Sequence, residues 1–509
     1  MLHADEPKPS ATEPLGLCGF GAPGILLDTD LAYGILSATL LPRDGLAKLN
    51  VRLNARTACY SELLMSSTLE RLRRLNSLRP QREPFSPAVV PQDPVHAAET
   101  GLRQGLVIRN ELGTCYVETH RYPLASTRGE SPLGTLLQHP TQPLARVYPD
   151  FRIEALSGYH AAAFLDTETT GLGTGAGVYA FMVGIGTFEA LAEDEPAAGT
   201  GSRPAGPSHF VVRQIFMRNP AEELALISEV VSSLAPYQLL VTFNGRSFDV
   251  PLLRARLRYN RPYLPETLLN APLLQEEAPH LDLLLPARRL WRRRLQSCRL
   301  AHLEEAVLSH ERTESDVPGY LIPQLYADYV RSGESAEMER VFYHNREDIV
   351  SMVSLTSQLT IAFDQQRTPE RRGALQGKDW LSLGIAYEHM EDLSQAEEAY
   401  VHSLESAESP ADKAEGYSRL SKLQKRQGRW EEAAETWQLW LTSVPGVDPS
   451  PYVELAKYCE WQLQDFEQAE MWASWALHEL RQVDSVFAWA RTIDELEHRL
   501  QRIRRKRNQ

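Results

Sequence analysis

Cysteine is scarce in this sequence, and the spacing that would link cysteines is missing. The five cysteines of the 509-residue chain are widely scattered and include no Cys-x-x-Cys pair: Cys18, Cys59, Cys115, Cys298 and Cys459. An odd number without paired spacing indicates neither a disulfide framework nor a zinc site. We therefore expect reduced thiols, as in a cytoplasmic protein.

Long apolar runs are also lacking. Residues 1–9 show no basic start followed by an apolar core, and no run of about 18 apolar residues occurs anywhere in the chain. We therefore expect a soluble protein of the cytoplasm, with no membrane partner.

An excess of positive charge is missing as well, since the net charge is −14. Such a chain does not coat nucleic acid through its general field, but a nuclease is not excluded, because phosphate binding depends on local patches. A hydrophobic content of 43% allows substantial cores. At roughly 150 residues per domain, the length predicts about two or three domains.

The most informative stretch is an apolar run that ends in two carboxylates, FLDTETTGL at residues 164–172. Side chains i and i+2 of an extended chain point the same way, so Asp166 and Glu168 converge. Crowded carboxylates repel, and Mg²⁺ or Mn²⁺ would relieve that repulsion. The alternative is a pair of surface acids that never meet, and only matching acids elsewhere in the chain speak against it.

Residues 158–362 alternate between strand and helix patterns, which predicts an α/β unit. Asn219 as N-cap and Pro220 in the first turn predict a helix that runs to about residue 234. The strand-like segments of this unit are residues 161–165, 179–185, 210–215 and 238–243.

Two later segments supply matching acids. Asp249 falls in the first helical turn after the strand at 238–243, where open α/β sheets gather their ligands, although it could equally stabilise that helix N-terminus. His344 and Asp348 lie four residues apart and share one helical face. An imidazole beside a metal-binding acid can orient or deprotonate a water; the alternative is an ordinary surface pair.

Three segments resemble, in order, the three exonuclease motifs of the DEDD class of the ribonuclease H-like superfamily: FLDTETTGL, TFNGRSFDVPLL and YHNREDIVSM. The likeness is closest to the bacterial YprB-type exonuclease-like proteins, in which such a domain accompanies tetratricopeptide repeats. This resemblance implies a metal-dependent 3'-5' exonuclease with two Mg²⁺ or Mn²⁺ ions. The implied metal ligands are Asp166, Glu168, Asp249 and Asp348, and His344 would take the proton of the attacking water.

The third motif departs from the common forms of the superfamily. One branch has His five residues before its last Asp and another has Tyr four before it, whereas here Tyr343 holds the first position and His344 the second. Tyr343 lies about 140° round the helix from Asp348, which favours His344 unless the helix breaks. Residues beside the acids are expected to contact the substrate: Thr169, Gly171, Leu172, Asn244 and Phe248.

A cluster of arginines at residues 288–294 surrounds Trp291. Arginine pairs with phosphate oxygens and Trp291 could stack on a base, so the cluster favours a substrate track. The alternative is a solvated basic face with Trp291 buried. For His280 and Asp282, which follow the second motif, we expect structural hydrogen bonds.

Beyond the polar linker at 365–377 the sequence predicts helices only. A tetratricopeptide repeat is matched by six residues: Trp380, Leu383, Gly384, Tyr387, Ala396 and Tyr400. The second half of the repeat recurs at Ala433, Trp437 and Pro445, and less cleanly at Ala469 and Ala473. Such hairpins stack into an array whose concave side commonly binds a partner, which leaves open a protein or peptide partner; packing against the first domain is the alternative.

The predicted organisation is therefore an α/β ribonuclease H-like domain, with a mixed sheet flanked by helices, followed by an all-α repeat domain. The expected function is 3'-5' exonuclease action on DNA or RNA; the alternative is a binding scaffold with a weakly active or inactive nuclease-like domain. The predicted segments begin with a loosely ordered region at 1–45 and an extension at 46–157, which has a helix over 46–75 and strands over 105–119. The exonuclease domain follows at 158–364, with an exposed insert at 191–207. The linker at 365–377, the repeats at 378–500 and a basic tail at 501–509 complete the chain.

Overall fold

The computed structural model describes residues 102, 104–171, 177–190, 206–313, 315–368, 372, 374–446, 448–482 and 486–509. All of them belong to one unit of the chain, Pro94–Gln509. The predicted loose region at 1–45 and the predicted helix over 46–75 lie outside the described residues, as does nearly all of the insert at 191–207.

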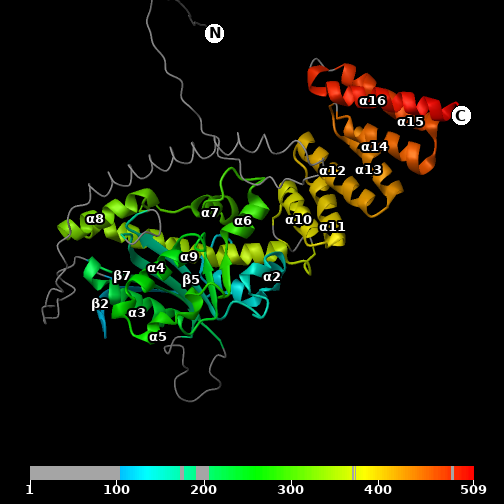
Figure 1. Ribbon diagram of the computed structural model, residues 1–509. Coiled ribbons are helices and arrows are strands. Elements are labelled where there is room, and N and C mark those ends of the chain that lie inside the picture. Colours follow the sequence, from blue (N-terminus) through cyan, green and yellow to red (C-terminus); the bar gives the residue numbers. More distant parts are fainter. Residues whose placement is uncertain are drawn as a thin grey trace, which may run out of the picture. The chain divides into compact units, whose positions relative to one another are not determined.

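Seven of the described strands form one mixed sheet (Figure 1). Its order is β1-β2-β7-β6-β5-β8-β9, antiparallel from β1 to β5 and parallel across β5, β8 and β9. The two short strands β3 and β4 pair separately. The strand bounds are β1 Leu106–Asn110, β2 Gly113–Pro123, β3 Thr127–Arg128, β4 Ser131–Pro132, β5 Ala162–Thr169, β6 Ala180–Glu189, β7 His209–Phe216, β8 Leu239–Thr242 and β9 His280–Asp282.

Helices cover both faces of this sheet because alternate strand residues are apolar on each side. Phe164 packs in one core with residues of α9, whereas Leu165 packs in a second core with residues of α3. The helix bounds in this part are α2 Gln142–Val147, α3 Glu223–Leu234, α4 Asp249–Tyr259, α5 Glu266–Leu269, α6 Leu284–Trp291, α7 Leu300–Leu308, α8 Ile322–Ser332 and α9 Ala336–Phe363.

Helix α9 lies close to the sheet because β6 carries glycines where the helix crosses. A Cβ atom on Gly184 would lie 2.2 Å from Oδ1 of Asn345 and 2.3 Å from Cδ1 of Ile349. A Cβ atom on Gly186 would lie 2.6 Å from Cγ2 of Ile349. Gly184 pairs with Asp166 on β5, so this close contact lies beside the first of the predicted acids.

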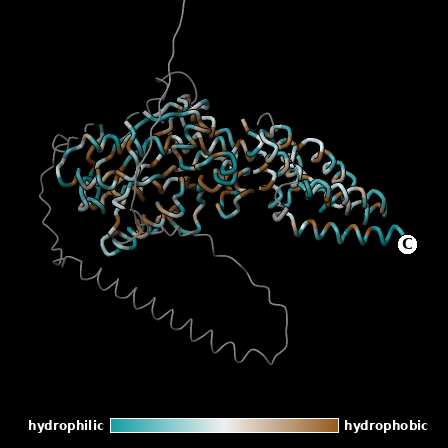
Figure 2. The backbone as a smooth tube through the Cα atoms, turned by 90° about the horizontal axis from the view of Figure 1, so that it is seen from above, coloured by the Kyte–Doolittle hydropathy of each residue, from teal (hydrophilic) through white to brown (hydrophobic). Residues whose placement is uncertain are grey.

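The C-terminal part consists of helices that contact their neighbours along the chain. Figure 2 shows hydrophobic positions recurring along otherwise hydrophilic helices, the pattern of faces packed in pairs. The bounds are α10 Gly377–His389, α11 Leu393–Glu405, α12 Pro410–Arg426, α13 Trp430–Ser443, α14 Ser450–Tyr458, α15 Phe466–Arg481 and α16 Val486–Arg507.

These helices divide between two hydrophobic clusters. Trp380, Tyr387 and Tyr400 of the first hairpin share a cluster with α6 and α9, whereas the later helices form a cluster of their own that includes Trp437 and Ala473. The first hairpin therefore packs against the α/β part, which was one of the two alternatives considered for the repeats.

Two local predictions are confirmed. Strands over 105–119 exist as β1 and β2, and the side chain of Asn219 accepts a hydrogen bond from the backbone N–H of Ala221 at 3.0 Å. The described cysteines carry no disulfide. No described helix combines the length and the apolar character needed to cross a membrane.

The basic residues at 501–509, predicted to form a tail, instead lie mostly in the last helix. Helix α16 continues to Arg507, and its basic side chains pair with acids of the preceding helices: Arg502 with Glu460 at 2.7 Å and Arg504 with Glu470 at 2.7 Å. The charge run is helical because buried and half-buried carboxylates hold it against the neighbouring helices.

Replacing Gly184 with alanine tests the close packing of α9. We expect Gly184→Ala to lower the free energy of unfolding by about 1–3 kcal/mol, because the added methyl group overlaps Asn345 and Ile349. Gly177→Ala is the matched control, since a Cβ there meets no atom within 4 Å. Both variants are compared with the wild type by denaturant unfolding; equal losses would contradict the packing described.

Candidate active site

The first two predicted acids lie on β5. Asp166 and Glu168 continue the alternation of Ala162 and Phe164, so their side chains leave the strand on the face that α9 covers. Glu168 is 9% exposed. The alternation of the strand therefore brings two carboxylates into a largely enclosed space below α9.

Helix α9 delivers the third motif to the same space. The amide of Asn345 donates to Oδ2 of Asp166 at 2.8 Å, and Oδ1 of Asn345 accepts from the amide of Gln214 at 2.9 Å. Gly184 lies between Asp166 and Gln214 in the register of the sheet, and its missing side chain makes room for Asn345. These contacts fix α9 so that His344 and Asp348, on adjacent turns, face β5.

Asp249, the acid of the second motif, is the first residue of α4. The hydroxyl of Thr167 donates to Oδ1 of Asp249. Asp282 holds the preceding turn by accepting from the backbone N–H groups of Asn244 at 2.8 Å and Arg246 at 3.1 Å. The expected structural role of Asp282 is confirmed, and its effect is to place the start of α4 next to β5.

The acids affect one another electrostatically. Burial raises the pKa of Asp166 well above its usual value, and the charges of Asp348, Glu168 and Asp249 raise it further. Burial is also the main reason that the pKa of Glu168 rises to about 7 and that of Asp249 to about 6. The four predicted acids therefore form one electrostatically connected group that resists carrying its full negative charge.

An arginine that the sequence reasoning missed partly neutralises this group. The guanidinium of Arg312 pairs with Asp348 and with Glu304, the latter at 2.6 Å. It also lies 3.3 Å from Nδ1 of His344. Arg312 is therefore a cation built into the site from the segment between α7 and α8.

His344 is held by a second carboxylate that the sequence reasoning missed. Its Nδ1 lies 2.8 Å from Oδ1 of Asp316, and its Nε2 lies 3.9 Å from Oδ2 of Asp348. Burial alone would lower the pKa of His344, but the charge of Asp348 and the hydrogen bond to Asp316 outweigh burial and raise it to about 10. The hydrogen bond to Asp316 leaves Nε2 facing the acids.

Tyr343 points elsewhere. Its hydroxyl accepts a hydrogen bond from the backbone N–H of Thr313 at 3.1 Å, outside the group of acids. Helix α9 is continuous through this region, so the helix break that would have exchanged the roles of Tyr343 and His344 is not present in it.

The predicted substrate-contact residues have different surroundings. The hydroxyl of Thr169 donates to the carbonyl of Gly171 at 2.9 Å, Asn244 has a positive φ of 68°, and Phe248 is 49% exposed beside Asp249. Leu172 lies outside the described residues. An exposed aromatic ring next to a site acid is available to stack on a base.

Whether these residues could hold divalent ions depends on their present partners. Within the described ranges, no three His, Cys, Asp or Glu side chains are already arranged around one point as metal ligands. Asp166, Asp249 and Asp348 instead bond to Asn345, Thr167 and Arg312. The oxygen donors and the raised pKa values fit Mg²⁺ or Mn²⁺, which would take over the neutralising role that Arg312 has on Asp348.

The predicted arginine track is wrong in part. Trp291 is 3% exposed and belongs to a core cluster, so it cannot stack on a base. Arg294 pairs with Asp379 at 2.9 Å and Arg293 with Glu415 at 2.9 Å. These two arginines join the segment that follows α6 to the C-terminal helices instead of facing a substrate.

Some of the missed residues have a weak signal in the sequence and others have none. Asn345 stands inside the third motif, next to His344, but nothing in the spacing says that its amide reaches Asp166. Arg312 and Asp316 lie in a segment without helical or strand periodicity. Only the three-dimensional arrangement brings that segment to α9.

Comparison with known proteins agrees with this geometry. Residues 163–360 match the RNase H superfamily. The chain is also 30% identical over 347 residues to the uncharacterized protein YprB of Bacillus subtilis (strain 168), an alignment that covers 67% of this chain and 74% of that relative. The chain belongs to the YprB family.

The match of residues 163–360 to the RNase H superfamily, together with the observed sheet, confirms the fold class that the sequence predicted. The mixed sheet of this YprB-family chain, flanked by helices, is ribonuclease H-like, and a C-terminal region of many helices follows it. The superfamily supports a nuclease domain that acts on nucleic acid with divalent metal ions.

The raised pKa of Glu168 predicts an unusual pH dependence. In the metal-free chain the unfolded carboxyl releases its proton at a lower pH than the folded one, so stability falls as pH rises from about 4.5 to about 7. Glu168→Gln removes this penalty. We expect the variant to be about 3 kcal/mol more stable than the wild type at pH 8 and nearly equal to it near pH 4.5.

Denaturant unfolding in EDTA at both pH values measures this difference. The exposed Glu154 provides the control variant Glu154→Gln, which should match the wild type at both. Addition of Mn²⁺ should stabilise the wild type more than Glu168→Gln. A difference between Glu168→Gln and the wild type that does not change with pH would contradict the electrostatic description.

Proposed function

We propose that this protein is a metal-dependent 3'-5' exonuclease of the DEDD class that hydrolyses phosphodiester bonds of DNA or RNA. The observation that supports it most is the electrostatic group of Asp166, Glu168, Asp249 and Asp348, which β5, α4 and α9 bring together. Four mutually repelling carboxylates in one place serve no purpose in packing, but they are the donors that two hard cations require.

Each residue of the site has a proposed task. Asp166, Glu168, Asp249 and Asp348 would hold two Mg²⁺ or Mn²⁺ ions. When bound, these ions supply a water of lowered pKa and stabilise the leaving 3'-oxygen. His344, oriented by Asp316, presents Nε2 toward the acids and is placed to accept the proton of the attacking water.

The proposed polarity of the reaction rests on the resemblance of the motifs. The three motifs resemble those of DEDD enzymes, which implies attack at a 3' end and release of a 5'-mononucleotide. Phe248, exposed beside Asp249, is proposed to stack on a terminal base, and the backbone around Thr169 and Gly171 to contact the terminal nucleotide.

We also propose the domain division of the sequence analysis, with the exonuclease domain at 158–364 and tetratricopeptide-type repeats at 378–500. The pairing of α10 with α11, α12 with α13 and α14 with α15 supports stacked hairpins. The hydrophobic cluster that Trp380 shares with α6 and α9 supports direct packing between the nuclease domain and the first repeat.

One observation favours the second candidate, a nucleic-acid-binding scaffold that cuts slowly. Arg312 holds Asp348, and the raised pKa of His344 keeps its ring protonated near neutral pH in the metal-free chain. A protonated imidazole cannot accept a proton. Activity therefore requires that cations bound at Asp348 and Glu168 offset the charges that raise the pKa of His344, and that Asp348 is released from Arg312.

An exonuclease assay separates the two candidates. The full chain is incubated with 5'-labelled single-stranded DNA or RNA in Mg²⁺ or Mn²⁺, and product lengths are followed on gels. We expect stepwise shortening from the 3' end, reduced at least about 10³-fold in Asp166→Asn, where a metal ligand is lost. The exposed Asp150 gives the control variant Asp150→Asn, which should match the wild type.

Two further variants test the assignment of the base. His344→Ala should lower kcat by about 10²–10⁴-fold, the usual contribution of a general base, whereas Tyr343→Phe should leave kcat unchanged. Asp166→Asn activity equal to that of the wild type would overturn the nuclease proposal. A loss in Tyr343→Phe with none in His344→Ala would reverse the assignment of the base.

A further inference from the structure

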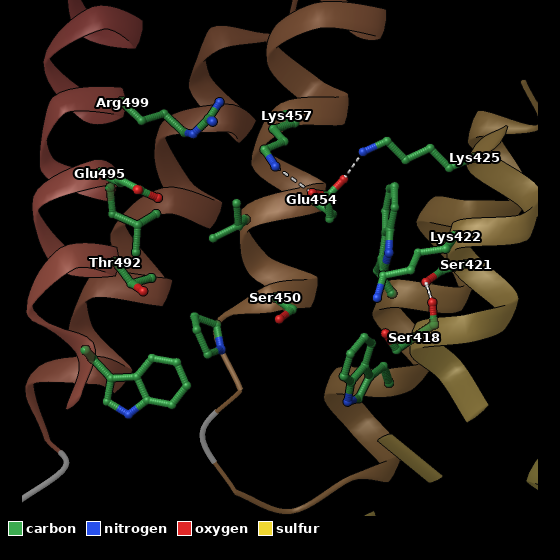
Figure 3. Close-up of a pocket in the computed structure, with 16 residues that line it drawn as sticks. Ser418, Ser421, Lys422, Lys425, Ser450, Glu454, Lys457, Thr492, Glu495 and Arg499 are labelled. Atoms are coloured by element: carbon green, nitrogen blue, oxygen red, sulfur yellow. Dashed lines mark hydrogen bonds and ion pairs between the residues drawn. The ribbon is translucent and has the colours of Figure 1, made fainter. Parts of the chain in front are cut away.

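The helical part contains a groove of about 430 Å³ between α12, α14 and α16, with Trp437 and Trp440 of α13 in its lining (Figure 3). Lys422 and Lys425 lie on the α12 wall, and Thr492, Glu495 and Arg499 on the α16 wall. Glu454 and Lys457 of α14 lie between these walls. The groove lies apart from the candidate active site and shares no residue with it.

Two lysines of the groove are held side by side by one carboxylate. Glu454 accepts from Lys425 and from Lys457, the latter at 2.6 Å, as Figure 3 shows. An ammonium group has three donors, and each lysine uses one of them on Glu454. The triad therefore keeps a net positive charge and several free N–H donors.

The opposite wall is positive for a similar reason. Arg499 contacts Glu460 at 3.1 Å, but Arg502 and Lys506 contact the same carboxylate at 2.7 and 2.9 Å. The single charge of this buried acid is outnumbered by its partners. Arg499 thus keeps part of its charge for an occupant of the groove.

The remaining lining residues point to the same chemistry. Lys422 is exposed and has no ion pair among the described residues, while Glu495 is already paired with Arg491 at 3.0 Å. The indole N–H of Trp440, which is 5% exposed, meets no acceptor among the described residues. The groove offers mainly donors and cations, and its half-buried apolar lining residues are Val453 and Trp489.

We propose that this groove docks an acidic peptide segment of a protein partner. Carboxylate side chains would take the free donors of Lys422, Lys425, Lys457 and Arg499, and apolar side chains would lie against Val453 and Trp489. A nucleic-acid strand is the poorer occupant, because Glu454 and Glu495 interrupt the cations and the volume holds only a few side chains. The proposal does not depend on the nuclease activity.

A displayed library of random 12-residue peptides, selected on the full chain in EDTA, is the probe for this groove. We expect enrichment of peptides that combine Asp or Glu with apolar residues. Synthetic fluorescein-labelled versions should bind with micromolar Kd in anisotropy titrations, more weakly as salt rises.

Charge reversal in the groove supplies the decisive comparison. Lys422→Glu should weaken binding at least tenfold without disturbing the fold, since Lys422 is exposed and outside the internal ion pairs. Lys413→Glu on the same helix, away from the groove, is the control and should bind as the wild type does. The double variant Lys425→Ala/Lys457→Ala should also lose at least tenfold, with circular dichroism as the check of its fold.

Three results would overturn the proposal. One is the absence of any enriched peptide, and another is equal affinity of the selected peptides for Lys422→Glu and the wild type. The third is displacement of those peptides by a single-stranded oligonucleotide of 12 nucleotides in EDTA, which would assign the groove to nucleic acid.

Discussion

The close contact between α9 and the sheet is the constraint on which the candidate site depends. Gly184 has no side chain where Asn345 must lie, and Asn345 in turn holds Asp166. The same contact sets the depth of His344 and Asp348 against β5. A residue that cannot itself perform chemistry therefore controls how closely the acids of β5 and α9 approach each other.

Repulsion among these acids is the second physical theme. Without ions, the protein's own groups are the partners of these acids: Arg312 pairs with Asp348, while Asn345 and Thr167 donate hydrogen bonds to Asp166 and Asp249. Each of these donors competes with a divalent ion for the same carboxylate oxygens. The affinity for metal thus depends on how much more strongly the carboxylates bind a cation than these protein donors. Arg312 is the strongest competitor, because it is the only charged donor of the three.

Much of the fold and of the site could be read from local pattern. Alternation brought Asp166 and Glu168 to one face, helical spacing paired His344 with Asp348, and Asn219 marked a helix start, because each of these depends only on neighbouring residues. Arg312 and Asp316 could not be found this way, since they meet His344 from a segment without periodicity. The arginines at 293 and 294 were misread because composition does not show which anion an arginine meets.

The hydrophobic cluster that joins α6 and α9 to the first helical hairpin has a consequence for how the chain can be divided. Trp380, Tyr387 and Tyr400 complete that cluster, and the buried carboxylate of Asp379 pairs with Arg294, which follows the end of α6. A fragment cut in the segment between Phe363 and Gly377 would expose this apolar surface to water and favour its aggregation. The smallest portion able to fold independently with the nuclease sheet therefore includes α10 and α11.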